Sequence, residues 1–391
     1  MKRLEKLPVR DAEFDECDPV EECTESVANE EQSVPVQQFD KDGKPIVNKK
    51  SKISPAAPVL PPFESREDRI GKYFKKHLKL FVFDEFAPLF MERAGIEFMA
   101  GVPVPLRKED YEQFKGGAGL KILHLAENMA WIMGIDPKFK YVPKYIEFMN
   151  RFFNFKILEG LVKEGRDSAE KGDMDSATIH FRAALVLKPD YLHSMYSYAR
   201  SCREHYLNSN NEEYIGRFKA ESIEYFELLT SVHPRFAQAY YFLGYGYLNM
   251  GLYQKASFTW KEFLRLSRNG KDKREIRQRM KQLEQPIEIE SGYTAVLAGR
   301  WEDGIRILEP YLNTNFKDWW PLSYYLGVAY SRTGRNSHAI ASFKRALGLN
   351  PSHVESMTEL ADIYSKSKDK VNENKYRKKA ELILQSKNKT E

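Results

Sequence analysis

The sequence predicts an all-α protein in which short helical hairpins repeat along the chain as an α-solenoid. Three observations favour this fold class. Small residues recur in apolar, helix-patterned segments at separations of 34, 45, 48, 35 and 34 residues: Gly165, Ala199, Gly244, Gly292, Gly327 and Ala361. A large apolar residue follows in the next segment of most units: Phe181, Phe226, Trp260, Leu308 and Phe343. Glycine turns separate the paired segments, and Pro189 and Pro351 follow the second segment of two units.

The clearest unit spans residues 323–351, where two helical patterns meet at Thr333-Gly334-Arg335. Each pattern has one apolar face at helical spacing. These faces contain Leu326, Gly327 and Tyr330 in the first helix, and Ala339, Phe343 and Ala346 in the second. The unit resembles a tetratricopeptide repeat, a helix–turn–helix of about 34 residues with a Leu-Gly…Tyr…Ala…Phe…Ala…Pro pattern.

The resemblance implies a superhelix of about six such repeats over residues 157–385. Repeat two has about eleven extra residues, which either lengthen its helices or extend its turn. A basic helix, KDKREIRQRMKQL, is inserted between repeats three and four. In the last repeat, polar Glu373 and Arg377 stand where earlier repeats have a small and a large residue, which is typical of a terminal cap. Residues 386–391 are expected to be disordered.

Two regions precede the repeats. Residues 1–62 are expected to be a disordered tail, because the first 35 contain eleven acidic and four basic residues and a Lys/Pro-rich stretch follows. This tail is either an acidic interaction segment on an extended linker or a dispensable solvated segment. Residues 63–156 are expected to form a helical N-terminal domain without the repeat signature. Within it, residues 70–81 have near-helical apolar spacing, Pro88 begins or kinks a helix, and Pro103 and Pro105 impose extended backbone.

Composition limits the functional classes. The net charge is +5 from 61 basic and 56 acidic residues, a mixed surface that does not itself require a nucleic-acid partner. The three cysteines, Cys17, Cys23 and Cys202, form no disulfide framework or zinc-ligand spacing, so we expect a reducing, cytoplasmic location. No secretory signal or uncharged stretch long enough for a membrane span is present.

No catalytic set emerges from the sequence, so we expect a non-enzyme without cofactor or metal. The eight histidines are scattered, and no established nucleophile or metal motif occurs. Residues 116–119 form a glycine-rich stretch before an apolar helix, but it lacks the Gly-Lys-Ser/Thr ending of a phosphate loop. We interpret it as a turn between helices. Cys202 is expected to be a packing residue.

The resemblance also implies a binding surface, because the first helices of such repeats line a concave groove. By resemblance, we assign the positions of each first helix that face the groove, and we call this assignment the groove register. It selects Arg166, Tyr196, Arg200, Arg203, Tyr241, Tyr245, Asn249, Tyr293 and Tyr324. Tyrosine and arginine dominate binding hot spots, so a protein or peptide with aromatic or aliphatic anchors and an acidic group suits this surface. Several of these tyrosines could instead pack one repeat against the next.

Three functions are compatible with this pattern. The first is a non-catalytic protein- or peptide-binding scaffold. The second is a peptide-responsive regulator whose N-terminal helices engage a partner, and the third is an enzyme whose repeats recruit the substrate. The basic stretches at 261–284 and near the C-terminus would bind nucleic acid only if their charges shared one face, preferably with exposed aromatic residues. A solvated helix face is the simpler interpretation.

Overall fold

The structure is a computed structural model that describes residues 60–115, 120–153 and 156–388. These residues belong to two compact units, which divide between Leu243 and Gly244, inside helix α10 (Ala237–Asn249). We call residues 60–243 the N-terminal unit and residues 244–388 the C-terminal unit. The sequence-based boundary between residues 156 and 157 lies inside the N-terminal unit. The predictions for residues 1–59, for the glycines at 116–119 and for residues 389–391 fall outside the described residues.

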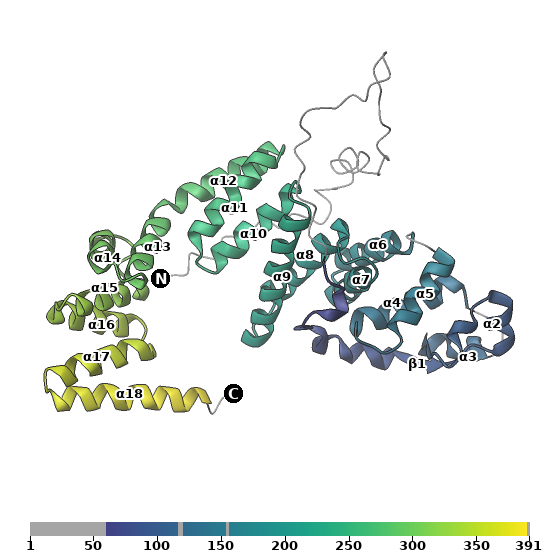
Figure 1. Cartoon of the computed structure of the whole chain (residues 1–391), viewed down its shortest axis with the longest axis horizontal. Coiled ribbons are helices and arrows are strands. Elements are labelled where there is room, and N and C mark those ends of the chain that lie inside the picture. Colours follow the sequence, from purple (N-terminus) through teal and green to yellow (C-terminus); the bar gives the residue numbers. More distant parts are fainter. Residues whose placement is uncertain (1–59, 116–119, 154–155, 389–391) are drawn as a thin grey trace, which may run out of the picture. The chain divides into compact units, whose positions relative to one another are not determined.

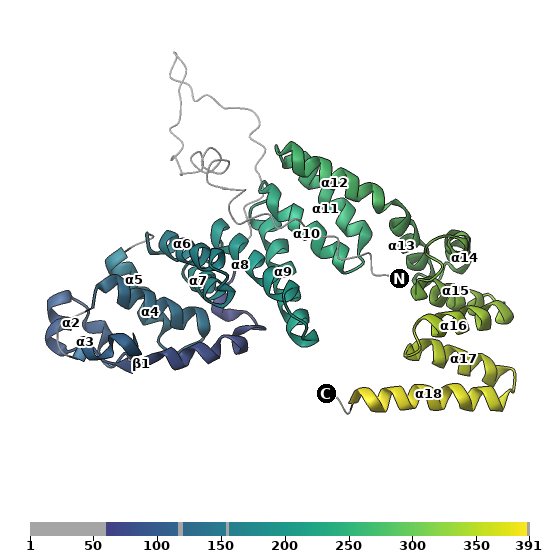
Figure 2. The ribbon, with the colours of Figure 1, turned by 180° about the vertical axis from the view of Figure 1, so that it is seen from behind.

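Helical hairpins follow one another through the repeat region, as the sequence predicts (Figures 1 and 2). Repeats one to three are α6 (Lys156–Glu170) with α7 (Met174–Leu187), α8 (Leu192–Leu207) with α9 (Glu212–Val232), and α10 with α11 (Tyr253–Leu266). The inserted helix α12 (Gly270–Gln282) comes next. Repeats four to six are α13 (Glu284–Leu297) with α14 (Trp301–Leu308) and η6 (Glu309–Asn313), α15 (Trp320–Arg332) with α16 (Asn336–Leu349), and α17 (Val354–Lys366) with α18 (Lys370–Asn388). The extra residues of repeat two lengthen α9 to 21 residues.

The small residues of the first helices are required by close helix packing. A Cβ atom added to Gly244 would lie 2.1 Å from Nε1 of Trp260, and one added to Gly165 would lie 2.4 Å from Cε1 of Phe181. In repeats four and five the same atom would lie 2.5 Å from Cδ2 of Leu308 and 2.7 Å from Cε1 of Phe343. Each large partner therefore occupies the volume that a side chain on the glycine would need. This confirms the pairing of small and large residues predicted from the sequence.

The turns inside repeats one, three, four and five share one backbone geometry. Gly172, Gly251, Gly299 and Gly334 all have φ between 75° and 80°, in the left-handed region. In repeat five the amide of Gly334 donates to Ser331 O and the amide of Arg335 donates to Tyr330 O. This is the Schellman pattern, which satisfies the last carbonyls of a helix and favours glycine.

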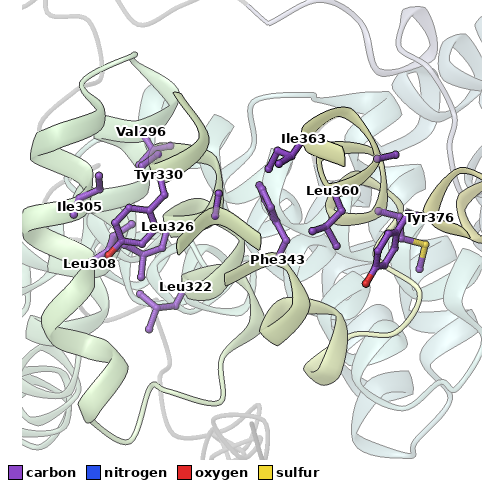
Figure 3. Packing of buried hydrophobic residues seen from close by; sticks show 14 of the residues in the cluster. Val296, Ile305, Leu308, Leu322, Leu326, Tyr330, Phe343, Leu360, Ile363 and Tyr376 are labelled. Carbon is purple, nitrogen blue, oxygen red and sulfur yellow. The ribbon is translucent and has the colours of Figure 1, made fainter. Parts of the chain in front are cut away.

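A continuous apolar core joins the hairpins of the C-terminal unit (Figure 3). Figure 3 shows Ile305, Leu308 and Tyr330 around Leu326 of α15, and Phe343 beside Leu360 of α17. The core therefore runs from one hairpin into the next, so each repeat stabilises its neighbours.

The last repeat differs from the expected register. Tyr376, not Arg377, fills the large position of α18 and stacks on Tyr364, with ring centroids 5.9 Å apart and an interplanar angle of 3°. Arg377 lies one residue further around the helix, where it pairs with Glu373 at 3.3 Å and Asp362 at 3.2 Å. Helix α18 also continues to Asn388, beyond the predicted end of the array at residue 385.

The N-terminal region contains more than helices. It comprises η1 (Phe63–Ser65), η2 (Gly71–Tyr73), η3 (Lys75–Leu80), β1 (Phe81–Asp84), α2 (Pro88–Ala94), η4 (Glu97–Met99), β2 (Val104–Arg107), η5 (Lys108–Asp110), α3 (Tyr111–Lys115), α4 (Ile122–Ile135) and α5 (Val142–Phe153). Strands β1 and β2 pair antiparallel, with Phe81 opposite Arg107. The helix predicted over residues 70–81 is wrong, because that segment forms short 3₁₀ turns and enters β1. Pro88 begins α2 and Pro105 lies in β2, as predicted, and Pro103 directly precedes that strand.

Aromatic residues explain this departure from helix. Residues 63–80, which we call the strap, insert their rings against repeat two: the Tyr73 ring lies 4.7 Å from that of Tyr214, and the Phe74 ring 6.2 Å from that of Phe218. Phe63 packs on Tyr198 at 6.1 Å. Burial of these rings against the repeats outweighs the weak helical preference of an isolated segment.

Arg182 of α7 connects the strap, α4 and the repeats. Its side chain is 1% exposed and donates from Nη1 and Nη2 to the two carboxylate oxygens of Asp68, at 3.0 and 2.7 Å. Its Nε donates to the carbonyl of Gly134 in α4 at 2.6 Å. Burial alone would raise the pKa of Asp68, but the hydrogen bond and charge of Arg182 outweigh it and hold that pKa below its ordinary value.

We predict that Gly327→Leu destabilises the C-terminal unit by about 1–3 kcal/mol, because the new side chain overlaps Phe343. The matched control is Gly348→Leu on α16, where an added Cβ meets nothing within 4 Å. Urea unfolding of both variants, followed by circular dichroism, measures the effect. Equal stability of the two variants would show that the predicted contact does not determine the helix separation.

The Arg182–Asp68 pair gives a second prediction. Asp68→Asn leaves the buried guanidinium without its counter-charge, so we expect the N-terminal unit to lose about 3 kcal/mol, near the lower limit for buried pairs because the Asp68 side chain is 26% exposed. Asp68→Asn/Arg182→Met removes the stranded charge and should be more stable than the single variant. Since the folded-state pKa of Asp68 is lowered, its contribution is present above pH ~4 and is lost as the pH falls further. A double variant no more stable than Asp68→Asn in urea unfolding at pH 7 would contradict this account.

Candidate functional site

The residues selected by the groove register occupy very different environments. Tyr196, Arg200, Arg203, Tyr241 and Tyr245 are between 3% and 7% exposed. Arg166, Tyr293 and Tyr324 are half-buried, and Asn249 is exposed. The first group is therefore largely inaccessible to a partner in this conformation. The half-buried group is better placed to contact one.

The buried arginines pack on aromatic rings of the next first helix. The guanidinium carbon of Arg200 lies 5.3 Å from the ring centroid of Phe242 and 5.7 Å from that of Tyr196. Arg203 lies 5.6 Å from the same Phe242 ring and pairs with Glu204 at 2.9 Å. These geometries are those of cation–π contacts, which contribute to packing between repeats.

The inserted helix α12 accounts for the burial of Tyr245. The Tyr245 hydroxyl donates to Oε1 of Glu275 in α12, at 2.5 Å. Its ring also lies 5.0 Å from that of Trp260 in α11. Burial and the neighbouring Glu275 raise the pKa of Tyr245 far above its ordinary value, so the phenol stays protonated. This tyrosine acts as a link between α10, α11 and α12.

A cluster of half-buried aromatic side chains lies on the first helices of repeats four to six. The Tyr293 ring of α13 stacks on the Tyr325 ring of α15, with centroids 4.9 Å apart and planes 20° apart. Tyr324 lies 5.2 Å from Tyr325 and 4.7 Å from His353. We call the complete set the aromatic face: Tyr293, Trp319, Trp320, Tyr324, Tyr325 and His353.

The sequence positions this face through the helical period of α15. Leu322, Leu326 and Ala329 point into the core of the C-terminal unit and are fully buried. The positions between them, Tyr324 and Tyr325, therefore lie at the edge of the buried stripe and keep part of their surface in solvent. Pro321 lies in the first turn of α15, directly after Trp320, where its fixed φ favours the start of a helix.

Burial gives this face a defined protonation state. It raises the pKa values of Tyr293, Tyr324 and Tyr325 above the ordinary tyrosine value, so all three phenols are neutral at physiological pH. Neutral phenols can donate and accept hydrogen bonds while their rings contact apolar groups or cations. The face is thus chemically suited to binding an amphipathic segment.

Acidic residues border the aromatic face on α17. The Glu355 side chain is 64% exposed and lies 3.2 Å from Nε2 of His353. Glu359 pairs with Arg332 of α15 at 2.9 Å, and Asp362 pairs with Arg377. Arg200 and Arg203, which favoured an acidic ligand, are instead packed on the Phe242 ring, and the exposed acidic side chain beside the aromatic face is that of Glu355.

Tyr325, Trp319, Trp320 and His353 were not selected from the sequence. The groove register names one position per turn, so it selected Tyr324 and omitted its neighbour. Trp319 and Trp320 are the N-cap and the first residue of α15, and they lie outside the register altogether. A run of six aromatic residues within residues 316–330 was the available signal, at Phe316, Trp319, Trp320, Tyr324, Tyr325 and Tyr330.

A small polar cavity lies between the strap and α9. It has a volume of about 220 Å³ and is lined by residues that include Phe63, Arg66, Arg69, Glu221 and Glu224. Arg66 and Arg69 both contact Glu224, so these three charged side chains of the lining already pair with one another. The volume is below the range of typical ligand pockets. The cavity therefore has a structural role as part of the strap contact.

The described residues offer few reactive groups. Cys202 is completely buried, as predicted, and burial raises the pKa of its thiol well above the ordinary value. Among residues 60–115, 120–153 and 156–388, no group of three or more His, Cys, Asp or Glu side chains could hold a metal ion. In the same residues no helix is both long and apolar enough to span a membrane.

Comparison with known proteins identifies one repeat directly. A family model described as tetratricopeptide repeat matches residues 323–353, the segment of α15 and α16 with the following turn. No curated protein matches the sequence.

Several solved structures are similar to parts of the chain. MamA from Desulfovibrio magneticus RS-1 is 16% identical with a TM-score of 0.28, covering 48% of this chain and 96% of its own. The TPR domain of P58(IPK) is 18% identical with a TM-score of 0.37, covering 58% of this chain and 60% of that chain. YrrB, described as a TPR protein with an unusual peptide-binding site, is 13% identical with a TM-score of 0.26, covering 53% and 97%.

Proposed function

Because the chain is a tetratricopeptide-repeat protein, we propose that it is a non-catalytic binding scaffold that holds a segment of a partner protein on its aromatic face. The observation that carries this proposal is the stack of half-buried rings across α13, α15 and α17. Rings that are rigidly packed yet partly exposed offer contact area at a small cost in side-chain entropy, which is typical of hot spots.

The shape and charge of the face favour an extended peptide. Its rings lie on α13, on α15 and at His353, the residue before α17, so an extended segment can place side chains on each of these in turn. Apolar or aromatic side chains of the peptide would contact Tyr293, Tyr324 and Tyr325. A basic side chain would lie over a tyrosine ring beside Glu355 of α17. We therefore infer a partner segment with apolar anchors and at least one Lys or Arg.

The proposal includes a reducing location such as the cytoplasm. Cys202, the one cysteine among the described residues, is a buried free thiol. A fold stabilised by apolar packing between repeats does not depend on disulfides.

We predict that Tyr324→Ala/Tyr325→Ala weakens binding of the partner peptide by at least about 2 kcal/mol, or roughly 30-fold in Kd, because both side chains are central to the face. The partner is first captured with the wild-type chain, and its binding segment is then synthesised and titrated by fluorescence anisotropy. The control variant Tyr376→Ala removes a buried tyrosine of the same unit. Measured below the melting temperature of this variant, its Kd for the peptide should equal that of the wild type.

Two results would contradict the proposal. One is a double variant with wild-type circular dichroism that still binds the peptide with unchanged Kd. The other is a Tyr241→Ala/Tyr245→Ala variant that stays folded and loses binding while the Tyr324/Tyr325 variant does not. The second result would place the site on α10, the centre favoured by the groove register.

A further inference from the structure

The helices α11 and α12 expose an unusual excess of basic side chains. Between residues 254 and 284, Glu284 is the only exposed acidic residue. Eight basic residues are exposed in the same stretch: Lys255, Lys261, Arg265, Arg268, Lys271, Arg274, Arg277 and Lys281. The near-balance of charge in the whole chain therefore does not apply to this surface.

Seven of the exposed basic residues, together with Phe258, form one row on each helix. The row on α11 is Lys255, Phe258, Lys261 and Arg265, and the row on α12 is Lys271, Arg274, Arg277 and Lys281. Both rows have offsets of three, three and four residues, which place all four side chains on one helix face. We call them the basic rows. The one-sided distribution that nucleic-acid binding requires is thus present on both helices.

The acidic residue Glu275 of α12 points away from the basic row, where it accepts the Tyr245 hydroxyl at 2.5 Å. On α11, Glu262 pairs with Arg265 of the row at 2.7 Å, which leaves Lys255 and Lys261 as the other basic residues of that row. Ile276, on the same side of α12 as Glu275, is completely buried. One side of α12 therefore packs against the C-terminal unit, and its opposite side carries the basic side chains.

The basic side chains on α12 are close enough to act together on one ligand. At 1.5 Å per residue, the row from Lys271 to Lys281 is about 15 Å long. Its neighbouring charges are separated by less than the Debye length of ~8 Å at physiological salt, so their potentials add. Arg274, Arg277 and Lys281 form no ion pair with any described residue. These three cations are available to an anionic partner.

An exposed aromatic side chain lies within the α11 row. Phe258 is 69% exposed, beside Lys255 and Lys261. An acidic protein surface would pair with the charges but has no need of this ring. Single-stranded nucleic acid uses both features, because phosphates pair with Lys and Arg while bases stack on aromatic rings. We propose that the basic rows bind single-stranded nucleic acid, with Phe258 as a stacking platform.

The test is anisotropy of a fluorescein-labelled 20-nucleotide oligouridine titrated with the full chain at several salt concentrations. Arg274→Gln/Arg277→Gln/Lys281→Gln removes three phosphate contacts, so the slope of log K against log salt should become shallower by about 2. Phe258→Ala should lower affinity about 5-fold or more without changing that slope, since stacking is not ionic.

The control variant Lys366→Gln/Lys378→Gln/Lys379→Gln removes the same charge from exposed positions on α17 and α18 and should retain the wild-type slope. Tyr324→Ala/Tyr325→Ala should bind the oligonucleotide normally, which separates this proposal from the peptide site. Three results would overturn the proposal: no binding by the wild type near 100 mM salt, the same slope for the α12 and control variants, or equal competition by poly-glutamate of matched charge. The last result would assign the rows to an acidic protein.

Discussion

The close approach of two helices in each repeat is the constraint on which the rest of this structure depends. In repeats one, three, four and five, a glycine in the first helix meets the ring or branched side chain of the second at a distance that leaves no room for a methyl group. Repeats two and six have the small residues Ala199 and Ala361 at this position. This contact sets the separation of the helices and hence the angle at which the next hairpin packs. The aromatic face exists because α13, α15 and α17 are brought side by side in this way.

In the N-terminal unit, a buried charge has the corresponding role. Arg182 projects from α7 and binds both the strap, through Asp68, and α4, through the carbonyl of Gly134. Further ion pairs join the strap to the repeats, including Lys76 with Asp175 and Lys72 with Glu213. The strap and α4 therefore pack on repeats one and two within one compact unit.

Repeated patterns made most of the fold predictable. The spacing of glycines and large residues located every hairpin, because each repeat solves the same packing problem with the same residue types. The strap was not predictable in this way, since Phe74 and Ile70 have near-helical spacing but their conformation is set by rings of α9 distant in sequence. The spacing of apolar residues within a segment does not reveal contacts with residues that are distant in the sequence.

The candidate site was only partly predictable, for a related reason. The register predicted which positions of each first helix line a binding groove, and two of them, Tyr293 and Tyr324, are half-buried and partly accessible. It could not show what covers that face elsewhere: Glu275 of the inserted helix contacts Tyr245, and Phe242 lies against Arg200. An inserted element changes the surface without changing the repeat pattern.

Hydrogen–deuterium exchange of the full chain, with and without its bound partner peptide, tests the central claim most directly. Because the peptide is proposed to lie across the aromatic face, backbone amides of α13, α15 and α17 should become more protected on binding, together with residues 316–320. Residues 63–153 should exchange at unchanged rates. Protection confined to α8 and α10, or to the N-terminal region, with no change in α15 would contradict the account.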